Sequence, residues 1–433
     1  MTLPAPARKT GAHAKRGRID PALIVILAGV SAALHVGKLP PALPVLQEAL
    51  GVTLVQAGFL LSLMQLAGMA LGLAVGLAAD GWGLKRSMAT GLWVLAGAGA
   101  LGGWARDPAD LLVLRAVEGF GLLLATLPAP GLVRALVPPA RTAAMLGLWG
   151  AYMPLGTAAA LLTGPLVMAA IGWPGWWWLL AALSGAMALW LGAAVPADAA
   201  RRTASAPPGS PTAAPATDAS TASAPQPPGW PQRLRQTLRA PGPWLVALSF
   251  AVYSAQWIAV IGFLPSLYVQ AGLSGGLVGV LTALAAAVNM VGNIASGRLL
   301  QGGVAPRSLL LVGFAAMGLG ALLAFAGTAA GPSLPPVVRY AAMLVFSMVG
   351  GLIPGTLFSL AVRLAPGEGT VSTTVGWMQQ WSSIGQFAGP PLVAWLASRV
   401  GGWQWTWMVT GACALVGAGL ALPIGRSLRR QGG

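Results

Sequence analysis

The sequence predicts an all-α integral membrane protein with twelve transmembrane helices in two six-helix repeats. Three observations lead to this prediction. Of 433 residues, 56% are hydrophobic and only 8% are charged, whereas a soluble domain carries about a quarter charged residues. Twelve apolar segments are each long enough to cross a bilayer, which takes about 20 helical residues. A long segment rich in Ala, Pro, Ser and Thr separates the first six from the last six.

The predicted spans follow one another through short loops inside each half. Those of the first half cover residues 21–45, 53–79, 87–105, 110–133, 142–170 and 174–195. Those of the second half cover residues 243–270, 274–298, 307–328, 338–362, 370–398 and 403–425. Most contain no charged residue once their ends are trimmed. The exceptions are the first span, with Lys38, and the fourth, with Arg115 and Glu118.

The composition divides the chain into five parts. A basic tail (1–20) precedes the first bundle (21–195), and a short tail (426–433) follows the second bundle (243–425). Between the bundles, residues 196–240 contain TASAPPGSPTAAPATDASTASAPQPPG, a composition typical of disordered linkers. We expect a cytoplasmic tether, with a regulatory role as the alternative. No small-residue cleavage site follows a short apolar core near the N-terminus, so we expect no removable signal peptide.

The basic residues test this count and set the orientation. With both termini in the cytoplasm, 20 of the 25 Lys and Arg lie on the cytoplasmic side, and only Arg106, Arg339 and Arg399 lie outside. This asymmetry is the positive-inside pattern, and shifting the count by one helix would scramble it. We therefore predict a multi-pass protein of a bacterial inner (plasma) membrane. The net charge of +16 is dispersed over short loops, which disfavours a nucleic-acid partner.

The two halves repeat local features in the same order. Pro-Gly pairs occur in the fourth and tenth spans, Gly-Pro pairs in the fifth and eleventh, and Gly-Trp clusters open the sixth and twelfth. The pairs begin at Pro130 and Pro354, Gly164 and Gly389, and Gly172 and Gly402. Their offsets are nearly constant, which indicates duplication. Bundles built from two repeats place a solute near the midplane between them and work by rocking.

The loop after the second span carries a motif. Gly76, Asp80, Gly83, Lys85 and Arg86 form a pattern that resembles G-x-x-x-D-x-x-G-x-[RK]-[RK] of the major facilitator superfamily. Asp80 could cap a neighbouring helix or pair with a basic residue, and Gly83 would permit a tight turn. We predict a gating role for these five residues. The alternative is a solvated turn with positive-inside charges.

Two further stretches resemble the same superfamily. Arg115 and Gly119 in the fourth span are similar to its R-x-x-x-G pattern, and HVGKLPPALPVLQ in the first span resembles its cyanate-permease-like members. The resemblance covers all twelve spans in topology but only short stretches in motif. It implies a secondary transporter that works by alternating access and not an enzyme.

Charged residues inside spans are the main candidates for substrate binding, because they are costly there and usually functional. His35 and Lys38 are three residues apart and share a helix face, as do Arg115 and Glu118. A lysine facing a dry cavity favours an anionic substrate, and His35 could couple protons. The alternatives are a lysine that snorkels to the headgroups, a packed neutral histidine and a structural ion pair between Arg115 and Glu118.

Uncharged polar and aromatic residues complete the predicted substrate site. Asn289 and Asn293 lie one helical turn apart, as a pair lining a cavity would. Each residue can instead make a helix–helix hydrogen bond. The other candidates are Tyr152, Tyr253, Gln256, Trp377 and Gln380.

Three functions compete. The first is a transporter of small organic or inorganic anions, with protons considered as the coupling ion, and the second is a multidrug or metabolite efflux antiporter coupled to protons. A membrane-embedded enzyme or sensor is remote, because two histidines and one cysteine leave little for a metal site and no HExxH or GxSxG string occurs. No metal or cofactor is expected, and the expected partners are a small-molecule substrate and the lipid bilayer.

Overall fold

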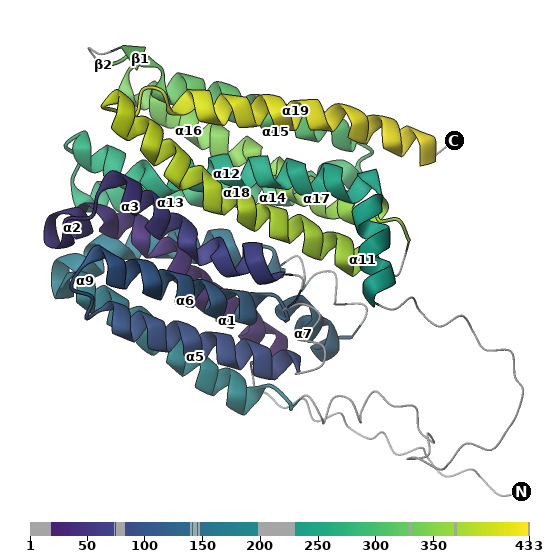
Figure 1. Cartoon of the computed structure of the whole chain (residues 1–433), viewed down its shortest axis with the longest axis horizontal. Coiled ribbons are helices and arrows are strands. Elements are labelled where there is room, and N and C mark those ends of the chain that lie inside the picture. Colours follow the sequence, from purple (N-terminus) through teal and green to yellow (C-terminus); the bar gives the residue numbers. More distant parts are fainter. Residues whose placement is uncertain are drawn as a thin grey trace, which may run out of the picture.

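The computed structural model describes residues 19–72, 74, 83–138, 141, 145, 148–197, 230–328, 331–367 and 370–431. Their helices form two bundles that lie side by side (Figure 1). Both described chain ends, Ile19 and Gln431, lie at the same end of the bundles, which we call the terminal end. The opposite, distal end carries a small hairpin of β1 (Gly327–Thr328) and β2 (Gly331–Pro332).

The first bundle begins with α1 (Pro21–Gly37), whose N-terminus is capped by the Asp20 carboxylate. Proline is favoured in the first helical turn because its missing N–H has no partner there in any case. The rest of the bundle contains α2 (Leu39–Leu50), α3 (Leu54–Ser62), η1 (Leu63–Gln65), α5 (Leu84–Gly102), α6 (Pro108–Thr126), α7 (Ala129–Leu136) and α9 (Tyr152–Ala194). The long α9 holds two predicted spans, which meet at Gly172, where φ is 72°.

The second bundle is preceded by the short helix α11 (Trp230–Arg239). Its first span, α12 (Pro241–Gln270), is continuous. The remaining helices are α13 (Gly275–Ala287), α14 (Asn289–Gln301), α15 (Pro306–Phe325), α16 (Pro336–Gly350), α17 (Leu352–Arg363), α18 (Val371–Val400) and α19 (Thr406–Gln431).

The predicted fold class is confirmed. Each of the twelve predicted spans coincides with helix over most of its described residues, and nine described stretches are long and apolar enough to cross a membrane. Within the predicted linker 196–240, residues 230–239 form α11, which the expectation of a disordered tether did not include. Trp230, Leu234 and Leu238 recur every four residues there and give the helix an apolar stripe. Residues 198–229 lie outside the described part.

The duplicated Pro-Gly pairs occupy matching places in the two bundles. In the first, α6 ends at Thr126 and α7 resumes at Ala129, just before Pro130. In the second, α16 ends at Gly350 and α17 resumes at Leu352, just before Pro354. Proline lacks an N–H and cannot continue the ladder of helical hydrogen bonds. The pairs therefore mark the same break in both repeats.

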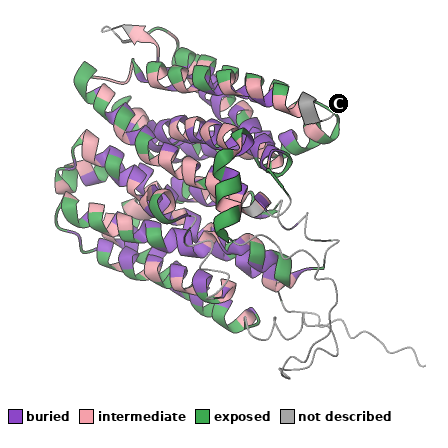
Figure 2. Ribbon diagram, turned by 45° about the vertical axis from the view of Figure 1, so that its right-hand side comes forward, coloured by how far each residue is buried: buried purple, intermediate pink, exposed green. Residues whose placement is uncertain are grey.

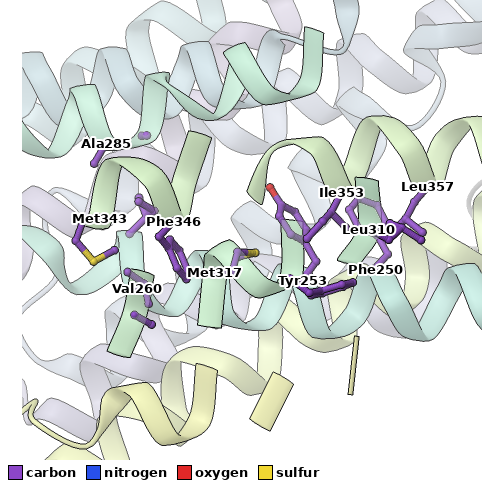
Figure 3. Close-up of a cluster of buried hydrophobic side chains, with 14 of the residues drawn as sticks. Phe250, Tyr253, Val260, Ala285, Leu310, Met317, Met343, Phe346, Ile353 and Leu357 are labelled. Atoms are coloured by element: carbon purple, nitrogen blue, oxygen red, sulfur yellow. The ribbon is translucent and has the colours of Figure 1, made fainter. Parts of the chain in front are cut away.

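Each bundle has its own apolar core, and a third cluster joins the bundles. Buried residues, purple in Figure 2, occur along the helices of both bundles. Phe250, Met317 and Phe346 are central to the core of the second bundle (Figure 3). The joining cluster combines Leu39, Leu43, Leu46, Leu60, Trp176 and Trp177 of the first bundle with Ala259, Phe263, Val393 and Ala394 of the second. These residues lie in the distal halves of their spans, so the bundles are packed together at the distal end.

Glycines allow this close approach on both sides of the joint. A Cβ atom at Gly58 of α3 would lie 2.9 Å from the Cα of Pro391 in α18. A Cβ atom at Gly279 of α13 would lie 3.2 Å from the carbonyl oxygen of Leu161 in α9. Small residues at such crossings let helix backbones pack closely, which is a main source of association between membrane helices.

Candidate functional site

The four charged candidates of the first bundle meet in one buried cluster. His35 lies in the last turn of α1, Lys38 sits at the junction with α2, and Arg115 and Glu118 lie on one face of α6. Their side chains are at most 1% exposed. Among the described residues they are the only buried members of the Asp, Glu, Lys, Arg and His types. The sequence predicted a shared face within each pair, His35 with Lys38 and Arg115 with Glu118; the meeting of the two pairs is a finding of the structure.

The Glu118 carboxylate is the centre of the cluster. Its Oε1 accepts a hydrogen bond from the Lys38 ammonium and lies 3.3 Å from Nδ1 of His35. Its Oε2 accepts a 2.7 Å bond from Nη1 of Arg115. The other ring nitrogen of His35 lies 2.8 Å from Oγ of Ser184 in α9. The carboxylate thus has a basic partner on each oxygen. Charge-assisted hydrogen bonds of this kind are stronger than those between neutral groups.

Arg115 also ties three helices together through backbone carbonyls. Its Nε donates to the carbonyl of Leu60 at 3.1 Å, and its Nη1 donates to the carbonyl of His35 at 2.8 Å. Its second terminal nitrogen, Nη2, is buried without a hydrogen-bond partner among the described residues. The guanidinium therefore links α6 to α3 and α1 and leaves the two N–H groups of Nη2 without an acceptor among the described residues.

The Lys38 ammonium points into the first bundle and not out toward the headgroups. It lies 4.7 Å from the ring centroid of Trp177, a cation–π distance. The Lys38 carbonyl accepts a 3.2 Å bond from the indole of Trp176. On the opposite side, a Cβ atom at Gly99 of α5 would lie 3.1 Å from the His35 ring. All of these neighbours belong to the first bundle, so the cluster is enclosed by that bundle and does not lie between the two.

The second bundle holds a neutral polar network instead. Asn289 begins α14, just after the break at Val288. Its Nδ2 donates to the Tyr253 hydroxyl at 3.1 Å and to the Ser347 carbonyl at 2.8 Å. Asn293 donates to Oδ1 of Asn289 at 3.0 Å, and Trp257 donates to Oγ of Ser347 at 3.2 Å. The network connects α12, α14 and α16 through helix–helix hydrogen bonds, the alternative considered for these residues.

Gln256 lies midway along α12. It is 1% exposed, and neither its Nε2 nor its Oε1 has a hydrogen-bond partner among the described residues. Just beyond it on α12, Ile258 packs into the core of the first bundle and Ala259 into the cluster that joins the bundles. A buried amide with no partner costs about 1–3 kcal/mol, so this side chain has unused hydrogen-bonding capacity close to the joint between the bundles.

Helix α18 places an amide against the first bundle and two indoles against α12 of its own bundle. Nε2 of Gln380 donates to the carbonyl of Met69 in the first bundle at 2.8 Å, while its Oε1 is buried without a partner among the described residues. Trp377 and Trp381 stack edge-on against Trp244 of α12, with ring centroids 5.0 and 5.6 Å away. The indole N–H groups of Trp377 and Trp381 are buried, and neither has a hydrogen-bond partner among the described residues.

Tyr152 does not join any of these groups. Its ring stacks on Trp149 with centroids 4.2 Å apart, inside the core of the first bundle. Its place among the substrate-binding candidates stays a prediction.

The gating motif is described only in part. Gly76 and Asp80 lie outside the described residues. Gly83 precedes α5 with φ of 112°, a conformation that favours glycine, and Arg86 is exposed. Nζ of Lys85 donates to the carbonyls of Gly192 at 2.8 Å and Val195 at 2.5 Å, at the end of α9. A cation there complements the negative end of the helix dipole. The proposed charge network with Asp80 stays a prediction.

Sequence reasoning missed three contributors to the charged cluster. Ser184 gives no signal, because a serine in an apolar span is common. Trp177 stands in a tryptophan cluster at the start of a span, where tryptophans usually serve as interfacial anchors, although its ring lies over Lys38. The role of the Leu60 carbonyl could not be predicted, because every residue has a backbone carbonyl and the sequence does not show which one accepts a hydrogen bond from a distant side chain.

Comparisons with known proteins agree with this architecture. A family model described as Major Facilitator Superfamily matches residues 22–390. The tetracenomycin C resistance and export protein of Streptomyces glaucescens is 28% identical over 172 residues, which are 39% of this chain and 32% of that protein. The match therefore spans about a third of that relative's length.

Solved structures with the same fold include a bacterial homolog of the human lysosomal transporter Spinster. Its inward-facing, unoccupied form superposes with a TM-score of 0.75 and 16% identity, over 96% of this chain and 99% of that one. Its inward-facing, occupied form gives a TM-score of 0.72 at 16% identity, over 94% and 96% of the two chains. The likeness concerns the fold, and the family model covers most of the chain. This protein therefore belongs to the Major Facilitator Superfamily of membrane transporters.

Proposed function

We propose that this protein is a secondary transporter that exports an aromatic or amphiphilic organic solute in exchange for protons. One observation carries the proposal. The buried polar atoms without partners among the described residues of α12 and α18 include the amides of Gln256 and Gln380 and the indoles of Trp377 and Trp381, besides the hydroxyls of Ser249, Ser266, Tyr268 and Thr374. Pockets that bind organic molecules are mostly apolar and aromatic, with a few polar groups that fix orientation.

The packing of the bundles fits alternating access. They share an apolar cluster at the distal end, and rocking one repeat against the other around a midplane site would open that end and close the opposite one. The positive-inside pattern supports a cytoplasmic location for the terminal end. The packed distal end would then be the closed outer side of a bacterial inner membrane, with the binding region reached from the cytoplasm.

The charged cluster is the candidate for proton coupling. Lys38 and Arg115 share the single carboxylate of Glu118, and His35 lies beside both. A cluster with two cations and one anion carries a surplus positive charge, which is costly in an apolar interior. Gaining or losing one proton changes this balance strongly. The cluster can therefore favour one packing of α1 against α6 in each protonation state.

The named activity of one relative supports the choice of solute. The matching Streptomyces protein is named for resistance to and export of tetracenomycin C. Export of an organic compound of this kind by this chain is consistent with the amide and indole groups of α12 and α18. The match covers about a third of that protein.

The test uses the purified full-length chain in liposomes with an acidic interior. Tetracenomycin C serves as the probe, and its accumulation is followed with and without the proton gradient. We expect gradient-dependent accumulation that falls at least tenfold in Gln256→Leu. The matched control is Gln301→Leu, which removes an exposed glutamine at the end of α14 and should leave accumulation unchanged. Failure of the wild-type chain to accumulate any aromatic probe would overturn the proposal.

A small anion is the second candidate. The surplus positive charge beside Lys38 favours it, as does the resemblance of the first span to cyanate-permease-like proteins. The same liposomes, given radiolabelled cyanate or benzoate, distinguish the two candidates. Anion uptake that depends on Lys38 would favour this candidate, whereas anion uptake that persists with unchanged affinity in Lys38→Ala would count against a role for that lysine.

A further inference from the structure

Helix α11 lies across the terminal end of the second bundle. Figure 1 shows its axis running roughly at right angles to the spans. Its sequence, WPQRLRQTLR, contains three arginines and no acidic residue. A helix with this direction and composition has the features of one that lies in the plane of a membrane interface.

The apolar stripe of α11 is only partly covered by the protein. Leu234 is half-buried and Thr237, on the same face, is fully buried where the helix packs on α12 and α18. The indole of Trp244 in α12 donates a 2.8 Å bond to the Leu238 carbonyl and fixes the end of α11. The two ends of the stripe stay outside this contact, with Trp230 57% exposed and Leu238 37% exposed. Apolar side chains remain outside the protein although the helix is anchored to it.

The arginines lie off this stripe, on the other sides of the helix. Arg235 and Arg239 are exposed, and Arg233 is half-buried, with a buried Nε that has no hydrogen-bond partner among the described residues. None of the three forms an ion pair with a described carboxylate. Guanidinium groups match phosphate oxygens in geometry and charge. Each basic group near an anionic leaflet contributes about 1 kcal/mol to attraction.

We propose that α11 is a binding site for anionic phospholipids. Trp230 and Leu238 enter the interface, and Arg233, Arg235 and Arg239 hold the lipid phosphates at the terminal end of α12 and α18. The site goes beyond the proposed transport activity and does not depend on the identity of the solute. Its ligand is a lipid headgroup of the membrane in which the protein resides.

The experiment measures thermal unfolding of the purified full-length chain in detergent with added phosphatidylglycerol or phosphatidylcholine. The test variant is R233Q/R235Q/R239Q. The matched control is R298Q/R307Q/R363Q, which removes three arginines at the ends of α14, α15 and α17 on the same side of the molecule. Both variants lose the same charge, so a difference between them reports the site and not the net charge.

We expect phosphatidylglycerol to raise the midpoint of wild type and control by several degrees above phosphatidylcholine. The α11 variant should lose at least half of this shift, and 0.5 M NaCl should weaken the shift in wild type because salt screens exposed charges. Equal shifts in the two variants, or no shift in wild type, would overturn the proposal. Should the triple variant fail to fold, R235Q/R239Q changes only exposed side chains and is read by the same criteria.

A second measurement separates anionic lipid from a merely apolar anchor. A nitroxide is attached at Leu238→Cys in a Cys413→Ser background, and its exposure to oxygen and to a water-soluble nickel complex is compared in vesicles. Phosphatidylglycerol should place the label deeper than phosphatidylcholine, and the R235Q/R239Q change should remove the difference. Equal depth in both lipids would mean that α11 does not recognise the anionic headgroup, and the proposal would fail.

Discussion

The two bundles bury polar side chains in their spans in different ways. The first concentrates charge, with Glu118 held by Lys38 and Arg115 beside the α1–α2 junction. The second uses a neutral network around Asn289, beside the α13–α14 break. In both, a helix interruption brings polar side chains and backbone carbonyls together. The two bundles therefore place different polar side chains beside a helix interruption. Only the charged cluster of the first bundle can change its net charge by binding a proton.

The largest effect is expected from Glu118→Gln. The substitution removes the only carboxylate of the cluster and leaves Lys38 and Arg115 as buried cations without a counter-charge. Removing one partner of a buried ion pair costs about 3–5 kcal/mol. Urea unfolding in detergent should show a loss in this range. Lys38→Met combined with Glu118→Gln removes one of the two cations and should recover part of it. A loss below about 1 kcal/mol in the single variant would contradict the central role of this carboxylate.

Substitutions of Arg115 and Lys38 are expected to differ in their cost to stability. Arg115→Met leaves a Lys38–Glu118 pair but removes the donor to the carbonyls of Leu60 and His35. Lys38→Met leaves a balanced Arg115–Glu118 pair and strands no backbone carbonyl. A buried acceptor without a partner costs about 1–3 kcal/mol. Unfolding should therefore show Arg115→Met to be the more damaging change by at least about 1 kcal/mol. The reverse order would mean that the ammonium, not the guanidinium, organises the cluster.

Substitutions in the neutral network of the second bundle should cost less stability than Glu118→Gln. Asn289→Ala removes the donor to Tyr253 and Ser347, and the expected loss is about 1–3 kcal/mol. Asn293→Ala is the matched control, because Asn293 is half-buried and donates only to Asn289. It should cost less than Asn289→Ala in the same unfolding experiment. A cost for Asn289→Ala equal to that of Glu118→Gln would remove the distinction between the bundles.

The sequence was most informative where physical constraints are local. Bilayer thickness fixes span length, so the spans could be assigned from hydropathy alone, and Arg115 and Glu118 could be paired from helical spacing. The sequence was least informative about the direction in which a side chain points. Lys38 could as well have faced a cavity or the headgroups, and only the packing of α1 against α6 and α9 turns it toward Glu118. Helix α11 was missed because ten residues at the end of a linker give a weak periodic signal.

The smallest effect on stability is expected where the proposed solute contact lies. Both amide atoms of Gln256 are buried without partners among the described residues, so Gln256→Leu removes an unmet hydrogen-bonding demand while keeping a similar volume. Replacing such a group by an apolar one is close to neutral or stabilising. Urea unfolding should show no loss, and a gain of up to about 1–2 kcal/mol is compatible with the same argument. A large loss of stability would show that Gln256 has a structural partner, and a reduced transport rate in that variant would no longer identify a contact with the solute. Unchanged stability together with reduced transport would assign Gln256 to solute binding. Substitution of Glu118 or Asn289 should instead lower the free energy of unfolding.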